Sequence, residues 1–252
     1  MFRMTTFVLC LMISSNAWAS PIMVFMGGFG SCALDGKTTE IKSSAMMNKT
    51  MDQVRNAYTN EIIEIRTCYA LGSDPIYVSS DALDLQSAPM NRDQLAQLVE
   101  DTATANNNAP IYLWGQSHGG WTAMDLVRRL PNLNYRALHT VDPISVRDCG
   151  PAVFIGGVIS GSSPGCRRAP QDLEPHYAQI SKSVARWTNW FQLEFTLLHS
   201  SKITAAHENV ERSFDAGWWI PMGAHRLMET DETMWSKVAN QITSDVCALS
   251  AH

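Results

Sequence analysis

A serine between two glycines is the residue of this sequence best suited to chemistry. Residues 115–120 read Gly-Gln-Ser-His-Gly-Gly, so Ser117 lies in the pattern Gly-x-Ser-x-Gly. The pattern is typical of a sharp turn from strand to helix, where flanking side chains would clash and the serine hydroxyl is left exposed. An apolar segment, 111–114, precedes it, and an amphipathic segment, 119–130, follows it. This context favours Ser117 as a nucleophile over a simple glycine-rich turn.

With this motif in this context, the chain resembles the α/β-hydrolases, in particular their small lipases, esterases and thioesterases. The resemblance implies an oxyanion hole made by two backbone N–H groups, one from the residue after the nucleophile and one from a loop after an early strand. His118 takes the first position. The turn Gly27-Gly28-Phe29-Gly30 takes the second, with Phe29 as the favoured donor and Gly28 next. One alternative is a simple turn. A phosphate-binding loop fits less well, because no lysine follows the glycines at the required spacing.

The general base is expected late in the chain, because the resemblance implies the order serine, acid, histidine. His225 has that place, in a loop before the last expected helix. His207 and then His199 compete with it. We expect His118 to contribute only its backbone N–H, and His139, inside an expected strand, to be structural.

The third member of the triad is predicted to be Asp142, at the end of the strand after the nucleophile helix. Pro143 favours an extended exit that holds the carboxylate at the strand tip. Many α/β-hydrolases carry the acid one strand later, although some lipases place it here. Asp215 and then Glu208 are the alternatives, and Asp142 as a turn residue is another interpretation.

The fold expected from this pattern is α/β, a mostly parallel central sheet flanked by helices, as in the α/β-hydrolases. Apolar runs alternate with helical patterns along the chain. The expected strands are 21–26, 61–68, 111–114, 135–141 and 202–206, and the expected helices are 46–58, 91–104, 119–130 and 232–246. Residues 144–180, rich in Gly, Pro and Ser, predict an irregular insertion, and 184–198 is expected to be partly helical.

The N-terminal residues have the pattern of a secretory signal. Arg3 precedes an apolar run, and Ala17-Trp18-Ala19 has the small residues that a signal peptidase accepts. We therefore expect 1–19 to be a signal peptide and 20–252 a single hydrolase domain, exported to the periplasm or secreted. The apolar run is too short to span a bilayer, and no later segment is a candidate transmembrane segment.

Charge and cysteine content restrict the partners. The chain has 19 basic and 24 acidic side chains, a net charge of −5, and its basic residues form no cluster. Nucleic acid and anionic membranes are therefore poor partners. Cysteine spacing disfavours zinc, and no metal or organic cofactor is expected. Cys149–Cys166 is the first choice of disulfide and Cys32–Cys68 the second, and the odd cysteine count after cleavage leaves at least one thiol unpaired unless it pairs between chains.

The substrate class is the least determined feature. Four tryptophans either form an apolar rim over the serine or belong to the core: Trp187, Trp190, Trp218 and Trp219. A rim would suit a small-molecule or lipid acyl ester, hence a lipase or carboxylesterase. Thioesterase and acyltransferase activities share the same machinery. A non-catalytic exported binding protein with this fold is the alternative of another class.

Overall fold

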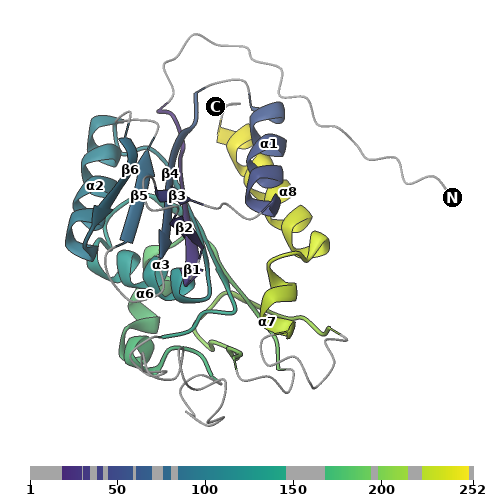
Figure 1. The fold of residues 1–252 in the computed structure, drawn as a ribbon. Coiled ribbons are helices and arrows are strands. Elements are labelled where there is room, and N and C mark those ends of the chain that lie inside the picture. Colours follow the sequence, from purple (N-terminus) through teal and green to yellow (C-terminus); the bar gives the residue numbers. More distant parts are fainter. Residues whose placement is uncertain are drawn as a thin grey trace, which may run out of the picture.

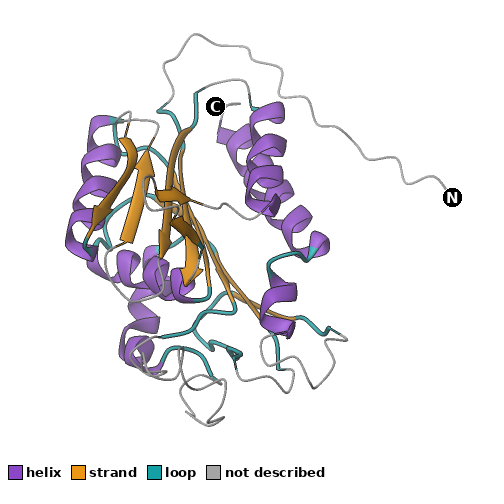
Figure 2. Ribbon diagram, viewed as in Figure 1, coloured by secondary structure: helices purple, strands orange, loops and turns teal. Residues whose placement is uncertain are grey.

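The computed structural model describes residues 19–29, 31–34, 39–41, 45–58, 61–69, 76–80, 85–145, 168–193, 198–214 and 223–249. These ranges form one eight-stranded sheet between two layers of helices (Figures 1 and 2). The strand order is β10-β9-β8-β7-β1-β4-β5-β6. The strands from β10 to β4 run parallel, whereas β5 pairs antiparallel with both β4 and β6. The fold class predicted from the sequence is confirmed.

The bounds of the strands follow the chain. They are β1 (Ile22–Phe29), β4 (Ile63–Tyr69), β5 (Ile76–Ser80), β6 (Leu85–Met90), β7 (Ile111–Gln116), β8 (Tyr135–Val141), β9 (Trp187–Phe191) and β10 (Glu208–Glu211). A separate antiparallel pair joins β2 (Cys32–Leu34) and β3 (Thr39–Ile41).

Central strand β1 separates two hydrophobic clusters, because successive side chains of a strand point to opposite faces. Ile22, Val24 and Met26 pack with α2 (Arg92–Ala105), α3 (His118–Arg129) and α6 (Tyr177–Ser183), which follows a 3-10 helix, η3 (Gln171–His176). Met23 and Phe25 pack with α1 (Ala45–Ala57) and α8 (Glu232–Leu249) on the opposite face (Figure 1). A strand buried on both faces is apolar throughout, as this one is.

Several predicted helices and one predicted strand agree with the structure. Asn91 caps α2, and its side chain accepts from the Gln94 N–H while the Gln94 side chain accepts from the Asn91 N–H. This reciprocal capping fixes the start of the helix. Strand β8 has the predicted bounds, and α1, α3 and α8 begin within one residue of their predicted starts.

Several predictions for the second half of the chain are wrong. Residues 187–191 form β9 and not a helix, because they pair with β8 on one side and β10 on the other. Residues 202–206 form no strand, and the last strand among the described residues is β10, a polar edge strand. The expected irregular stretch ends by residue 170, where η3 and α6 follow; 146–167 lies outside the described residues. In the first half of the chain, strands β5 and β6 were not expected.

The described cysteines are all paired. Cys32 and Cys68 form a disulfide with 5.2 Å between Cα atoms, so the second-choice pairing is confirmed. Cys247 is disulfide-bonded as well, and no described cysteine is free. Cys149 and Cys166 lie outside the described residues. None of the described helices is long and apolar enough to cross a bilayer.

Two of the four tryptophans belong to the core. Trp187 is fully buried in the cluster with α3 and α6, and Trp190 is 2% exposed in the cluster with α8. The interpretation of these two as a rim over the serine is therefore wrong. Trp218 and Trp219 lie outside the described residues.

Candidate active site

Ser117 occupies a strained turn between β7 and α3. Its φ is 54°, in the left-handed region that side chains other than glycine rarely adopt. The flanking glycines make the turn possible. A Cβ on Gly115 would lie 2.3 Å from the Gly119 carbonyl oxygen, and one on Gly119 would lie 2.0 Å from the Met26 carbonyl oxygen. The Gly-x-Ser-x-Gly pattern is thus a steric requirement of α3 packing directly on β1.

Backbone hydrogen bonds fasten this turn to the end of β8. The Ser117 N–H donates to the Val141 carbonyl at 2.8 Å, and the Ile144 N–H donates to the Ser117 carbonyl at 3.1 Å. These two bonds lie on either side of Asp142. The positions of the predicted nucleophile and the predicted acid are therefore fixed to one another through the backbone.

Asp142 is fully buried and its carboxylate is well supplied with donors. Its own backbone is in the left-handed region at φ 43°, and its N–H donates to the Trp190 carbonyl at 2.7 Å. Oδ1 accepts from the Ser200 N–H at 2.6 Å, and Oδ2 accepts from Gln192 Nε2 at 3.0 Å. A buried charge needs such partners, since an unpartnered one is costly.

The remaining partner of the carboxylate is His225, whose Nδ1 lies 2.6 Å from Asp142 Oδ2. His225 is 3% exposed and belongs to the short helix α7 (Gly223–Met228), so its predicted place in a loop is wrong. The contact joins residues 83 apart in the sequence. Among the described residues no hydrogen bond links Ser117 and His225 directly; such bonds often shorten only when substrate binds.

Two of the predicted oxyanion donors, Gly28 and His118, lie next to the serine. A Cβ on Gly28 would lie 2.8 Å from Ser117 Cβ and 3.3 Å from Ser117 Oγ, so Gly28 touches the serine side chain. The strand does not stop before the glycines as expected. β1 leaves β7 after Met26 but stays paired with β4 as far as Phe29, with an irregular register between them. His118 is the first residue of α3, where an N–H has no acceptor within the helix.

The other histidines have structural contacts. His118 stacks on Trp121, with 5.1 Å between ring centroids, and burial lowers its pKa to about 3. Burial likewise lowers the pKa of His139 to about 3. His207 Nδ1 accepts from the Trp187 N–H at 2.8 Å, and the His199 ring contacts the Ser200 carbonyl. Neither competitor of His225 contacts Asp142.

Only one of the two alternative acids, Glu208, lies among the described residues, and it pairs elsewhere. Glu208 forms a 2.6 Å ion pair with Lys237 on α8, and Asp215 lies outside the described residues. Sequence reasoning missed Gln192 and Ser200. No motif marks either residue, and Gln192 follows a segment that was expected to be partly helical.

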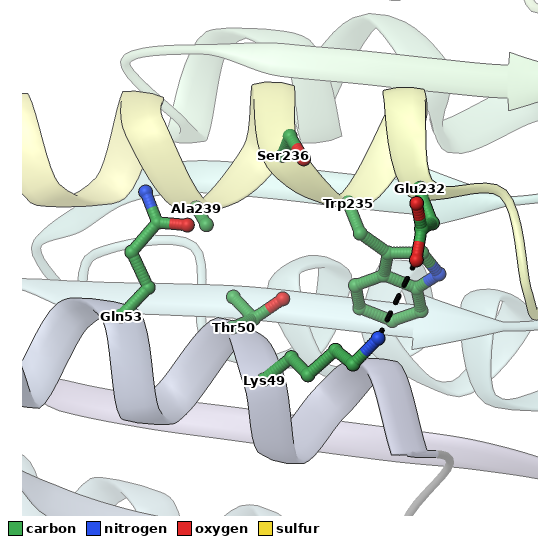
Figure 3. A pocket seen from close by; sticks show the side chains of 7 residues that line it. All are labelled: Lys49, Thr50, Gln53, Glu232, Trp235, Ser236 and Ala239. Atoms are coloured by element: carbon green, nitrogen blue, oxygen red, sulfur yellow. Dashed lines mark hydrogen bonds and ion pairs between the residues drawn. The ribbon is translucent and has the colours of Figure 1, made fainter. Parts of the chain in front are cut away.

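A cavity of about 200 Å³ lies away from these residues, between α1 and α8 (Figure 3). Lys49 and Glu232 form an ion pair across it at 3.4 Å, and Trp235 also lines it. It contains none of the predicted site residues. Within the described ranges no three His, Cys, Asp or Glu side chains gather as metal ligands would.

The order of the strands and the serine turn after β7 together decide the architecture. The chain has the α/β-hydrolase fold. No family model and no curated protein matches the sequence.

Solved structures with a similar course of the chain include a gene product of Listeria innocua (lin2722), at 12% identity and TM-score 0.48, covering 87% of this chain and 92% of that one. A study of carboxylesterases from Nitrososphaera gargenis supplies another, at 9% identity and TM-score 0.47, covering 92% and 93%. An α/β superfamily hydrolase from Oenococcus oeni matches at 11% identity and TM-score 0.45, covering 94% and 95%.

Proposed function

We propose that the protein is a serine hydrolase that cleaves acyl esters through a covalent acyl-enzyme. Ser117 is the nucleophile, His225 the general base and Asp142 the acid that orients it. The observation that carries the proposal is the 2.6 Å contact between His225 Nδ1 and Asp142 Oδ2. Asp142 lies at the end of β8, to which the Ser117 backbone is hydrogen-bonded. A buried carboxylate, an imidazole and a serine in a sharp strand-to-helix turn are the groups that together activate a hydroxyl.

The chemistry has two matched halves. Ser117 Oγ forms a bond to the acyl carbon while His225 Nε2 takes the hydroxyl proton. The carbonyl oxygen becomes an oxyanion, which collapses as the alcohol leaves with the proton from His225. Water then attacks the acyl-enzyme in the same way, and Ser117 regains its proton. Asp142 fixes the tautomer that keeps Nε2 free to accept, and it stabilises the imidazolium that forms.

The oxyanion is stabilised by the backbone N–H of His118 and by one from the end of β1. Gly28 or Phe29 supplies the second donor, and the contact of Gly28 with the Ser117 side chain supports this placement. The oxyanion also faces the N-terminal end of α3, where the helix dipole favours negative charge.

Small-molecule or lipid acyl esters are the proposed substrates, as in lipases and carboxylesterases. Thioesters, or an acceptor alcohol in place of water, would use the same residues. The test is hydrolysis of p-nitrophenyl esters of graded chain length by the wild type and by Ser117→Ala. Turnover by the wild type alone supports the proposal, and the preferred chain length defines the acyl class. A folded wild type that turns over none of them favours a binding protein.

We also infer export to an oxidising compartment. The Cys32–Cys68 disulfide and the pairing of Cys247 support this, because such bonds persist mainly in exported proteins. Expression of the full chain in a bacterial host, followed by N-terminal sequencing of the periplasmic protein, tests it. We expect the mature protein to begin at Ser20; an uncleaved protein in the cytoplasm would contradict the inference.

A further inference from the structure

A buried glutamine links the proposed acid to a separate segment of the chain. Gln192 directly follows β9 and is fully buried. Its Nε2 donates to Asp142 Oδ2 at 3.0 Å and to the Leu198 carbonyl oxygen, also at 3.0 Å. The one nitrogen therefore directs its two hydrogens to two different acceptors.

The same segment returns a hydrogen bond to the acid. The Ser200 N–H donates to Asp142 Oδ1 at 2.6 Å, on the other oxygen of the carboxylate. Leu198 and Ser200 thus hold Gln192 and Asp142 in a closed ring of hydrogen bonds. With one donor on each oxygen besides His225, the carboxylate cannot rotate without breaking a buried hydrogen bond.

A side-chain amide is the group that suits this position. It is neutral and carries two hydrogens on one atom, whereas a hydroxyl has one and an ammonium would add a buried charge. The position of the carboxylate matters because it sets the direction of the imidazole, and small displacements of a catalytic group reduce the rate strongly.

We propose that Gln192 is a positioning residue, which holds the Asp142 carboxylate in the orientation that aims His225 at Ser117. The inference rests on the proposed function of these three residues. Gln192 touches neither substrate nor the reacting atoms in this role. Its loss would therefore reduce kcat and leave KM nearly unchanged.

The strand offers a matched control in Asn189, another fully buried amide of β9. Its Nδ2 donates to the Ser201 carbonyl and to Asn209 Oδ1, both at 3.0 Å, so it fastens the neighbouring part of the same segment. It makes no hydrogen bond to Asp142. A purely structural role of Gln192 would make variants at 189 and 192 behave alike.

The experiment compares Gln192→Met with Asn189→Ala on a p-nitrophenyl ester that the wild type hydrolyses. We expect Gln192→Met to lose roughly 10- to 100-fold in kcat at nearly constant KM, whereas Asn189→Ala loses thermal stability but keeps a kcat near that of the wild type. Equal losses of kcat in both variants, or a folded Gln192→Met with wild-type kcat, would overturn the proposal.

Gln192→Glu provides a second reading that does not depend on the tolerance of the site for methionine. The shape is almost unchanged, but two buried carboxyl groups this close cannot both ionise readily, so the new carboxyl takes up a proton and has one hydrogen where the amide has two. It can bond either Asp142 or the Leu198 carbonyl but not both, so kcat should fall at nearly constant KM and fall further at high pH, where the new group ionises and repels Asp142. A kcat–pH profile that coincides with that of the wild type overturns the inference. A wild type without esterase activity instead overturns the proposed function itself, so the two failures are distinguishable.

Discussion

The middle and the end of strand β8 both bury ionisable side chains, yet their surroundings differ. His139, in the middle, is fully buried, and neither ring nitrogen has a hydrogen-bond partner among the described residues. Asp142, just past the end, is equally buried but accepts from Ser200, Gln192 and His225. Burial alone makes a neutral, chemically silent histidine. Burial with directed partners gives the Asp142–His225 pair, which in the proposed function exchanges a proton with the Ser117 hydroxyl.

The backbone conformation also differs between His139 and Asp142: it is regular at the first and strained at the second. His139 lies in regular parallel pairing with Trp114 and Thr188. Asp142 and Ser117 are both in the left-handed region of backbone conformations. Strain of this kind persists only where neighbouring bonds enforce it, and it concentrates at functional sites.

The largest difference in kcat is expected when Asp142 and His139 are each replaced by a residue that does not ionise. Asp142→Asn should reduce kcat by about 10⁴-fold, because the amide favours the wrong imidazole tautomer. His139→Leu should leave kcat near the wild-type value, since the ring has no hydrogen bond to any of the proposed catalytic residues. Steady-state hydrolysis of one ester by both folded variants checks this. A large loss in His139→Leu with little loss in Asp142→Asn would reverse the assignment.

A smaller but still large effect is expected from Gly28→Ala. The added methyl group would lie 2.8 Å from Ser117 Cβ, so the serine side chain or the end of β1 must shift. Displacement of one oxyanion donor costs roughly 10²- to 10³-fold in kcat. Circular dichroism provides the control for folding. A folded Gly28→Ala with unchanged kcat would remove the end of β1 from the site.

The smallest expected effect is on the thermal stability of the protein at acid pH, where the two buried groups should again differ. Burial lowers the pKa of His139 to about 3, below the ordinary 6.5, so the folded state resists its protonation. The contribution of His139 is intact above pH 6.5 and is lost as pH falls toward 3, by up to about 1.4 kcal/mol per pH unit. His139→Leu should therefore flatten the fall of Tm between pH 6.5 and 4.5.

Thermal melts of wild type and His139→Leu across that pH range measure this difference. His118, whose pKa is lowered in the same direction, keeps part of the acid sensitivity in both proteins. Melting curves that fall in parallel would show that His139 does not carry the effect.

The serine turn, and the pairing of Asp142 with His225 as candidate acid and base, could be predicted because each residue has a local or ordinal signal. The glycines at 115 and 119 indicate that a helix packs closely on a strand, and Asp142-Pro143 indicates the end of a strand. The residues that complete the site carry no such signal. Gln192 acquires its role only when β9 pairs with β8 and the chain returns at Ser200. The local pattern of its segment predicted a partly helical structure. Pairing of β9 with its neighbouring strands overrides that pattern.

The central claim is that Ser117 carries a hydroxyl activated by His225. Its most direct test is reaction with a fluorophosphonate probe, followed by intact mass and peptide mapping. We expect one adduct per chain, on Ser117, with labelling lost in Ser117→Ala and much slower in His225→Ala. A folded wild type that is not labelled, or an adduct on another residue, would contradict the account.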